Sequence, residues 1–387
     1  MNTRILIAPD SFKGSLSALR AAEAIRRGIL GVLPDARISL LPIADGGEGT
    51  VDAILAGAGG RRVEVTVTGP LGMPVPAAYG VLADGRTAVV EAAAACGLHL
   101  LRPEERNPFL ATTRGVGELL MHAAATGCET ILLGVGGSAT NDAGAGMLKA
   151  LGARFLGADG GELPDGAAGL ESLAYTDMGA WRWPQQGPNV VLAADVTNPL
   201  CGPQGASAVY GRQKFPSHED ATPTAIRRLD RILERVAEVA APLVGEAAAY
   251  APGAGAAGGL GYAALAFLGA TMRPGVQVVL EATRFNERAQ DADLVVTGEG
   301  ALDSQTLYGK AVRGVCEAAQ SHGVPVVAIA GSVSATSDEL RALGLAAWCS
   351  IAQGPMDLPQ MLASAESLVE AAAGSMARWL TVGHRLP

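Results

Sequence analysis

Cysteine and histidine are scarce in this chain of 387 residues, and their scarcity excludes several kinds of site. The five histidines are scattered and none has the spacing of metal ligands. The cysteines are far apart, odd in number and without a C-x-x-C pair, so neither a disulfide framework nor a cysteine zinc site is predicted. Reduced, buried thiols are expected at Cys96, Cys128, Cys201, Cys316 and Cys349.

Charged residues make up only 17% of the sequence, and no run of basic residues occurs. The net charge of −9, from 29 basic and 38 acidic residues, disfavours a nucleic-acid partner. Hydrophobic residues reach 49%, which is enough for sizeable cores and argues against disorder. The first ten residues meet Pro9 and Asp10 too early for a signal peptide, so a cytoplasmic location is expected.

A long bulky hydrophobic run is also missing. Residues 247–272 carry no charge, but they are rich in glycine and alanine and contain Pro252. A membrane span needs a sustained run of bulky apolar residues. We therefore predict no membrane segment.

The standard nucleotide-binding signatures are absent. The pair Gly309-Lys310 lacks both the first glycine and the following Ser or Thr of G-x-x-x-x-G-K-[ST]. Gly253, Gly255 and Gly258 spell G-x-G-x-x-G, but a strand does not precede them, which favours packing or phosphate contact. A nicotinamide-dependent oxidoreductase stays open as an alternative function on this motif, and a non-catalytic sugar-acid sensor is a second alternative.

The order of apolar runs predicts two α/β domains. Strand–helix units at both ends of the chain predict one sheet of about five parallel strands. The period-two alternation over 62–68 and the turn pair Asp84-Gly85 predict antiparallel or mixed β structure between them. The strands of the parallel sheet are expected at 4–8, 38–45, 293–297, 324–330 and 346–351.

We therefore expect a discontinuous first domain of residues 1–63 and 285–387. Residues 64–284 would form an inserted mixed α/β domain. The cleft between the two domains is the default position for an active site.

Five polar, glycine-rich loops follow apolar strands and supply the candidate chemistry. Glycines let the backbone approach phosphate oxygens, and acidic side chains can hold Mg²⁺. Lys13 and Lys310 can neutralise charge on a transferring phosphoryl group, so together these are parts for phosphoryl transfer from a nucleotide. The loops are 9–15, 45–50, 134–146, 195–206 and 297–306.

The stretch 293–310 is the most informative. An apolar strand is predicted to open there into a polar loop, which enters a helix near Tyr308 or Gly309. Open α/β sheets present their ligand sites at this kind of strand–turn–helix junction.

Six motifs in the order of the chain resemble the type-1 glycerate kinases. They are APDSFKGSLSA, DGGEGT, GGSATNDAGAG, ADVTNPLCGPQGA, GAGAAGGLG and DLVVTGEGALDSQTLYGK, and they extend over essentially the whole sequence. The resemblance implies a flavodoxin-like, doubly wound parallel-sheet domain with an inserted mixed α/β domain. It also implies an ATP- and Mg²⁺-dependent enzyme that makes phosphoglycerate from D-glycerate, usually the 2-phospho product. One departure is Ala143, where many relatives have a second glycine.

The candidate catalytic residues are Asp195, Lys13 and Asp10. Asp195 is a general base or a Mg²⁺ ligand, and sequence alone does not separate the two roles. It could also merely bond the N–H groups of its own turn. The metal candidates are Asp195, Glu299 and Asp303. The nucleotide-side candidates are Gly298, Glu299, Gly300, Gln305, Thr306, Lys310, Gly258 and Gly259.

The candidate substrate contacts lie in loops of both domains. Lys13 with Ser11 and Ser15 is the candidate pocket for the glycerate carboxylate. A turn or helix cap is the alternative role for several of the acidic and amide residues. The substrate candidates are Ser11, Ser15, Asp45, Glu48, Ser138, Asn141, Asp142 and Asn198. A homodimer is among the states that the sequence allows.

Overall fold

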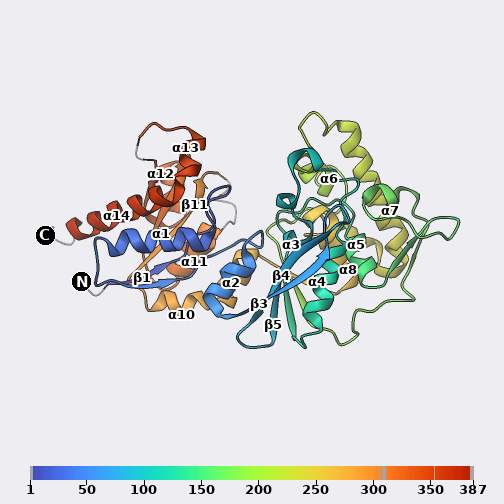
Figure 1. The fold of residues 1–387 in the computed structure, drawn as a ribbon, viewed down its shortest axis with the longest axis horizontal. Helices are drawn as coiled ribbons and strands as arrows, with labels where there is room; N and C mark the ends of the chain where they lie inside the picture. Colours follow the sequence, from blue (N-terminus) through green and yellow to red (C-terminus); the bar gives the residue numbers. More distant parts are fainter. Residues whose placement is uncertain (1–2, 305, 307–310, 353, 384–387) are drawn as a thin grey trace. The chain divides into compact units, whose positions relative to one another are not determined.

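The structure is a computed structural model that describes residues 3–304, 306, 311–352 and 354–383. The chain divides into two compact units, drawn in Figure 1. Unit 1 comprises residues 1–45, 52–59 and 276–387, and unit 2 comprises residues 46–51 and 60–275. The sequence placed the two main boundaries at 63/64 and 284/285, and it did not separate the short segment 46–51 from the first domain.

Unit 1 is built on a five-stranded sheet with the order β13-β12-β11-β1-β2. All neighbouring strands in it are parallel. Counted along the chain this is the order 2-1-3-4-5, which is the doubly wound order of flavodoxin. The predicted fold class is therefore confirmed for this unit. The strands are β1 (Arg4–Ile7), β2 (Arg37–Leu40), β11 (Leu294–Leu302), β12 (Val326–Val333) and β13 (Leu345–Ser350).

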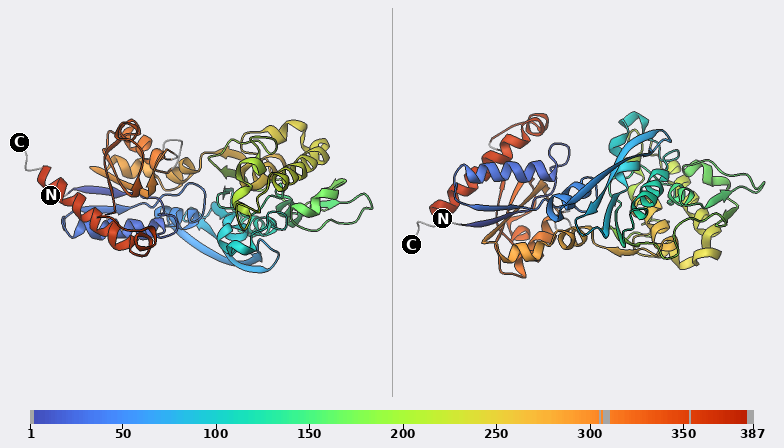
Figure 2. Two further views of the ribbon diagram at one scale, coloured as in Figure 1. Left: turned by 90° about the horizontal axis from the view of Figure 1, so that it is seen from above. Right: turned by 60° about the horizontal axis from the view of Figure 1, so that its bottom comes forward.

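Helices lie on both faces of this sheet (Figures 1 and 2). Helices α1 and α14 pack together on one face, over Ile5, Val296 and Ile329 of the strands. Gly28 of α1 allows their close approach, because a Cβ there would overlap the carbonyl oxygen of Glu370. The helices are α1 (Ala18–Leu30), α2 (Thr50–Ala58), α9 (Gly275–Ala282), α10 (Phe285–Gln290), α11 (Ala311–Gln320), α12 (Ser337–Ala342), α13 (Leu358–Ala363) and α14 (Ala365–Gly383).

Strand β11 is longer than the sequence predicted. The predicted strand ended at residue 297, but β11 continues to Leu302 because β12 is long enough to pair with it. Glu299 pairs with Ala330 in this ladder. Gly298, Glu299 and Gly300 are therefore strand residues, and the predicted loop through residue 306 begins only at 303. The predicted helix start at Tyr308 or Gly309 lies outside the described residues.

Unit 2 contains a mixed six-stranded sheet with the order β10-β9-β6-β5-β4-β3. Strands β3, β4 and β5 are antiparallel, whereas β5, β6, β9 and β10 are parallel. The predicted hairpin turn is confirmed: Gly85 has φ +67°, and the Asp84 carboxylate accepts a 2.8 Å hydrogen bond from the N–H of Arg86. The strands are β3 (Gly60–Thr68), β4 (Pro74–Leu82), β5 (Thr87–Glu91), β6 (Thr130–Gly134), β9 (Asn189–Ala193) and β10 (Thr271–Arg273).

The longest helix of unit 2 confirms the predicted amphipathic segment. Helix α7 (Pro223–Val244) begins after Thr222, whose hydroxyl accepts a 3.1 Å hydrogen bond from the N–H of Ala225. Leu229, Leu233 and Val236 are buried along one stripe. A two-stranded ribbon, β7 (Arg154–Leu156) with β8 (Tyr175–Asp177), completes the β structure. The other helices are α3 (Ala93–Cys96), α4 (Arg114–Ala124), α5 (Ala145–Ala150), α6 (Ala206–Tyr210) and α8 (Leu260–Phe267).

All five cysteines are free thiols, as predicted. Three are buried as predicted, whereas Cys201 and Cys349 are partly exposed, contrary to the prediction. Among the helices of the described residues, none is both long enough and apolar enough to cross a membrane.

Two glycines of β11 differ in how closely their surroundings are packed. A Cβ at Gly298 would overlap the carbonyl oxygen of Ile329. A Cβ at Gly300 would lie 3.4 Å from its nearest atom, the backbone nitrogen of Lys13. We expect Gly298→Ala to cost about 1–3 kcal/mol by overpacking and to lower Tm by about 2–10 °C. Gly300→Ala should leave Tm within about 2 °C. Equal melting temperatures for the two variants in calorimetry would contradict this assignment.

Candidate active site

The switch point of the unit 1 sheet lies between β1 and β11, where the chain connections leave in opposite directions. Open α/β sheets bind ligands outside the carboxyl ends of their strands at such a point. Asp10 lies there, three residues after the end of β1. Its backbone N–H donates a 2.8 Å hydrogen bond to the carbonyl of Gly298, so the loop is held to β11. The side chain is only 7% exposed.

Burial and like charge act together on the Asp10 carboxyl. Burial first, and then repulsion by the carboxylates of Asp45 and Glu299, raise its pKa from the ordinary 3.8 to about 7. The N–H of Ser11, 2.6 Å from Oδ1, and the Lys13 ammonium oppose this shift. Three of the predicted acidic candidates are therefore electrostatically coupled in unit 1. A carboxyl with a pKa near 7 is suited to exchange a proton at neutral pH.

Glu299 is fixed by a threonine from the loop that follows β11. The hydroxyl of Thr306 donates a 2.7 Å hydrogen bond to Oε1 of Glu299, and both side chains are buried. The N–H of Thr306 also donates to the Asp303 carboxylate at 3.3 Å, and the N–H of Asp303 donates to the Thr306 hydroxyl at 3.2 Å. Thr306 therefore links the two acidic candidates of this loop. The candidates Gln305 and Lys310 lie outside the described residues.

Lys13 is exposed in a tight turn between β1 and α1. The N–H of Phe12 donates to the carbonyl of Leu16 at 2.9 Å, and the N–H of Leu16 donates back at 3.0 Å. Ser15 closes the same turn, because its hydroxyl donates a 2.9 Å hydrogen bond to the Phe12 carbonyl. Ser15 thus has a structural partner, whereas the Lys13 ammonium extends from a rigid support.

Asp195 follows β9 in unit 2 and is exposed. Its Oδ1 accepts a 2.8 Å hydrogen bond from the N–H of Gly275, the first residue of α9. A carboxylate at a helix N-terminus is favoured by the helix dipole. Asp195 therefore has a capping contact with a distant segment, which the sequence did not reveal.

Asn198 holds together the loop that follows Asp195. Its Nδ2 donates a 2.7 Å hydrogen bond to the carbonyl of Gln204, and its Oδ1 accepts one of 2.7 Å from the Tyr210 hydroxyl. Both ends of this amide are thus bonded within the protein. We therefore favour a structural role for Asn198 over the predicted substrate contact.

Comparison with known proteins decides the family of this chain. The model of the glycerate kinase family matches residues 5–381. The chain belongs to the glycerate kinase family. It is 47% identical to a glycerate kinase from Bacillus subtilis (strain 168), over 97% of each chain. It is 41% identical to a glycerate 2-kinase from Escherichia coli (strain K12), over 99% of each chain. A crystal structure assigned to glycerate kinase 2 from Salmonella typhimurium LT2 superposes with a TM-score of 0.85, at 45% identity over all of both chains.

Membership of the glycerate kinase family confirms the resemblance seen in the six motifs. It also makes the chain a phosphotransferase enzyme. The motif GGSATNDAGAG forms a loop of unit 2 that contains the candidates Ser138, Asn141 and Asp142.

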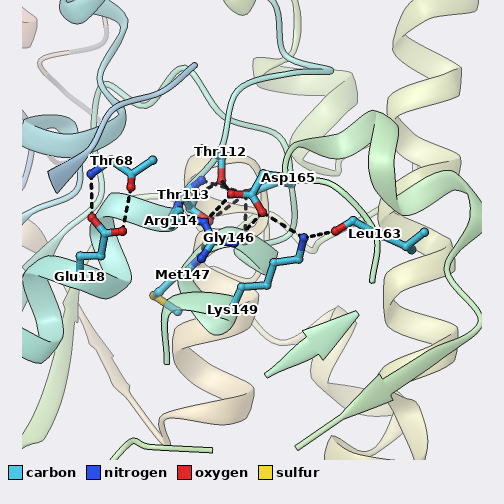
Figure 3. A network of polar contacts seen from close by, with 11 residues as sticks. Thr68, Thr112, Thr113, Arg114, Glu118, Gly146, Met147, Lys149, Leu163 and Asp165 are labelled. Atoms are coloured by element: carbon cyan, nitrogen blue, oxygen red, sulfur yellow. Dashed lines mark hydrogen bonds and ion pairs between the residues drawn. The ribbon is translucent and has the colours of Figure 1, made fainter. Parts of the chain in front are cut away.

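Asp142 in this loop is completely buried and fully hydrogen-bonded. Its Oδ2 accepts from the N–H and the hydroxyl of Thr113, both at 2.9 Å, and from the N–H of Gly146 at 3.2 Å. Its Oδ1 accepts from the N–H of Gly144 at 3.1 Å. We therefore assign Asp142 to the structure of the loop and not to the substrate. Thr113 and Gly146 lie beside the ion-paired residues Arg114, Asp165 and Lys149 (Figure 3).

Asn141 and Ser138 differ from Asp142. The Nδ2 of Asn141 donates a 3.0 Å hydrogen bond to the Ser207 hydroxyl, but its buried Oδ1 has no hydrogen-bond partner among the described residues. Ser138 is only 4% exposed. Asn141 therefore keeps a polar atom that a ligand could satisfy.

The family motif GAGAAGGLG forms the support of this loop. A Cβ at Gly258 would overlap the carbonyl of Thr140, and one at Gly259 would lie 2.5 Å from Cα of Ala143. Both positions therefore have backbone neighbours so close that only glycine fits there. Ala143 itself has φ +53°, a conformation that glycine adopts more readily.

Two buried charged residues near the candidate loops were missed by sequence reasoning. Glu91 ends β5 and accepts hydrogen bonds from the N–H groups of Gly49, at 3.2 Å, and Val51. It thereby anchors the segment 46–51 within unit 2. The sequence signal that could have identified Glu91 is a charged residue at the end of an apolar strand. The exposed candidate Glu48 lies on this segment, 3.7 Å from Nδ1 of His99.

Lys214 is the second missed residue, and the sequence holds no clear signal for it. It is 1% exposed and donates a 2.6 Å hydrogen bond from Nζ to the carbonyl of Thr140. Burial lowers its pKa to about 8, against the opposing effect of the Asp142 carboxylate. Lys214 thus supports the same loop from the side of the 3₁₀ turn Arg212–Lys214.

A cluster of three or more acidic, histidine or cysteine ligands does not occur among the described residues. Mg²⁺ needs fewer protein ligands, because it is bound by one or two carboxylates together with phosphates and water. The mutual repulsion of Asp10, Asp45 and Glu299 shows a negative potential that a cation would relieve. The unit 1 residues therefore fit a magnesium ion, with Glu299 as the best-fixed carboxylate.

We expect Asp10→Asn to stabilise the protein at pH 8. The folded-state pKa of Asp10 is raised from 3.8 to about 7, so the folded state binds the extra proton between these values. The stability contributed by this group is therefore lost as pH rises through that window. The variant should increase the free energy of unfolding by about 1–3 kcal/mol at pH 8 and raise Tm by about 2–8 °C. The gain should shrink at pH 5, and a Tm difference independent of pH would contradict the raised pKa.

We expect Asp142→Asn to destabilise unit 2 strongly. The NH₂ group of the new amide would face N–H groups that now donate to the carboxylate. These buried N–H groups would lose their acceptor, which should lower the free energy of unfolding by about 2–5 kcal/mol. Tm should fall by about 5–15 °C. Ser138→Ala, in the same loop, is the matched control and should change Tm by less than about 2 °C. An Asp142→Asn variant as stable as the wild type in calorimetry would sink the structural assignment.

Proposed function

We propose that this enzyme transfers the γ-phosphoryl group of ATP to D-glycerate, giving phosphoglycerate and ADP. The observation that carries the proposal is the family match over residues 5–381, together with relatives named as glycerate kinases along nearly the whole chain. The cytoplasmic location expected from the sequence stays a prediction.

Asp10 is the residue best suited to act as general base. With a pKa near 7, its carboxylate can accept the proton of the substrate hydroxyl while the hydroxyl oxygen attacks the γ-phosphorus. The new oxygen–phosphorus bond forms as the bond to ADP breaks, and the electron pair leaves with ADP. Its rigid position beside β11 and its hydrogen bond from Ser11 favour one orientation of the carboxylate.

Lys13 and the acidic residues around β11 have complementary roles in the proposal. The exposed Lys13 ammonium, on its closed turn, would bind the carboxylate of the substrate or an oxygen of the phosphoryl group. Glu299 and Asp303, linked by Thr306, would hold Mg²⁺ from the side of β11. When bound, Mg²⁺ neutralises the negative charge that the phosphates bring to this site.

Unit 2 supplies the polar groups that we propose for the hydroxy acid. The Asn141 Oδ1 atom would accept a hydrogen bond from a hydroxyl group of glycerate, and the Ser138 hydroxyl would donate or accept one. We propose the Asp195 carboxylate, which accepts a hydrogen bond from the N–H of Gly275, as a metal or substrate contact. Gly258 and Gly259 remain candidates for contact with the nucleotide.

The 2-phospho product is preferred in the proposal because the curated relative from Escherichia coli is named glycerate 2-kinase. Phosphorus NMR of the product of ATP and D-glycerate tests the proposal, because 2- and 3-phosphoglycerate give distinct signals. ADP formation that requires glycerate and Mg²⁺ is the expected result. Glycerate binding without ADP formation in calorimetry would favour a sensor, and tight NAD binding would favour an oxidoreductase.

We expect Asp195→Asn and Asp195→Ala to separate charge from structure. The amide oxygen of Asn can still accept the bond from Gly275, so this variant should keep the wild-type Tm. Because we propose that the carboxylate acts in the transition state, turnover should fall about a hundredfold or more. Asp195→Ala should lose turnover and also about 1 kcal/mol of stability through the lost cap. Turnover of Asp195→Asn within about threefold of wild type would limit the residue to capping.

A further inference from the structure

Residues 206–214 form one segment of unit 2, in which a 3₁₀ turn follows helix α6 (Figure 1). Two of its side chains contact consecutive residues of the loop GGSATNDAGAG. The Ser207 hydroxyl accepts a 3.0 Å hydrogen bond from Nδ2 of Asn141. Nζ of Lys214 donates a 2.6 Å hydrogen bond to the carbonyl of Thr140, the preceding residue. This segment therefore holds both the side chain of Asn141 and the peptide bond before it.

The Thr140 carbonyl is also confined by the glycine motif GAGAAGGLG. A Cβ at Gly258 would lie only 2.0 Å from this carbonyl oxygen, so the backbone of residue 258 is in direct contact with it. The N–H of Ala143 donates a 3.0 Å hydrogen bond to the carbonyl of Gly258, which fastens the two loops to each other. Close backbone contact and the bond from Lys214 together hold the peptide between Thr140 and Asn141 in one position.

Lys214 is an unusual residue for a purely structural contact. It is 1% exposed, and the bond to Thr140 is the one hydrogen bond or ion pair of its ammonium among the described residues. An ammonium has three N–H donors, and burying it without full pairing is unfavourable. Burial accordingly lowers the pKa of Lys214 to about 8. A buried charge of this kind is weak evidence for stability, and fixing one conformation is its better supported use.

Asn141 is held so that one end of its amide stays unsatisfied. Its side chain is completely buried, Nδ2 is bonded to Ser207, and Oδ1 has no hydrogen-bond partner among the residues that the structure describes. A buried acceptor that stays unpaired when a ligand binds lowers the affinity for that ligand. A site built to bind a hydroxyl group therefore rejects an analogue without it far more strongly than an apolar pocket rejects a missing methylene group.

We propose that Asn141 makes this enzyme specific for acids that carry a second hydroxyl group, and that Ser207 and Lys214 are the positioning residues that maintain this specificity. The inference rests on the proposed function, in which unit 2 binds the hydroxy acid. In D-glycerate the C2 hydroxyl accepts the phosphoryl group, and the C3 hydroxyl donates a hydrogen bond to Oδ1 of Asn141. D-lactate has the same configuration at C2 but a methyl group at C3, so it leaves Oδ1 unpaired.

The test compares kcat/KM for D-glycerate and D-lactate, with ATP and Mg²⁺ present. The wild type should prefer D-glycerate by about a hundredfold or more. Asn141→Ala removes the acceptor, so the preference should become at least about tenfold smaller, with kcat/KM for D-lactate within about threefold of wild type. If D-lactate is not turned over, the ratio of its inhibition constant to the KM of D-glycerate measures the preference. A preference that Asn141→Ala leaves unchanged would overturn the proposal.

A double-mutant cycle tests the two positioning residues. Ser207→Ala and Lys214→Met should each reduce the preference by about threefold or more, and neither should reduce it further in an Asn141→Ala background. Lys149→Met is the matched control, because Lys149 is also a buried lysine of unit 2 but pairs with Asp165. This control should lower Tm and leave the preference unchanged. Ser207→Ala decides the question if Lys214→Met does not fold.

The same measurements separate a failure of this inference from a failure of the proposed function. A wild type that forms no ADP with D-glycerate would remove the proposed function. Normal turnover of D-glycerate, with a preference that does not depend on Asn141, would overturn the specificity role alone. Reductions of equal size with and without Asn141 would limit Ser207 and Lys214 to a structural role.

Discussion

The pairing of β1 with β11 is the contact on which the organisation of this protein depends. It joins Ile5 to Leu294 across nearly the whole chain, so the inserted unit must leave and return between them. The same pairing creates the switch point of the sheet. Because the loop after β1 is bonded to Gly298, Asp10 and Glu299 are held at one edge, where neither strand alone could place them.

Concentrating carboxylates at that edge has a cost in stability. The Asp10 carboxyl is buried beside Asp45 and Glu299, and its raised pKa shows that a charge there is unfavourable for the folded core. Such a cost is retained where the charge is useful in another state, as when a cationic or proton-donating ligand is bound. The unfavourable electrostatic free energy of these carboxylates thus favours the binding of such a ligand.

The fold could be predicted from sequence because its signals are local, whereas the roles of individual residues depend on contacts between distant segments. Strand–helix alternation and the turn at Asp84-Gly85 determine the two sheets. The extension of β11 to Leu302 depends on β12, which no local pattern reveals. Asp142 resembles a ligand-binding residue in sequence, yet its carboxylate accepts hydrogen bonds from Thr113 and from its own loop. Lys214 gives no signal, because only the fold buries it beneath Thr140.

The glycine motifs of unit 2 hold two loops in close backbone contact. Ala143 and Ala257 both adopt left-handed conformations, and the N–H of Ala143 donates a 3.0 Å hydrogen bond to the carbonyl of Gly258. Two strained loops are therefore stacked backbone to backbone, with no room for a side chain at Gly258 or Gly259. Strain of this kind persists only where neighbouring contacts enforce it. The close packing at these glycines thus supports Asn141, whose buried Oδ1 has no hydrogen-bond partner among the residues that the structure describes.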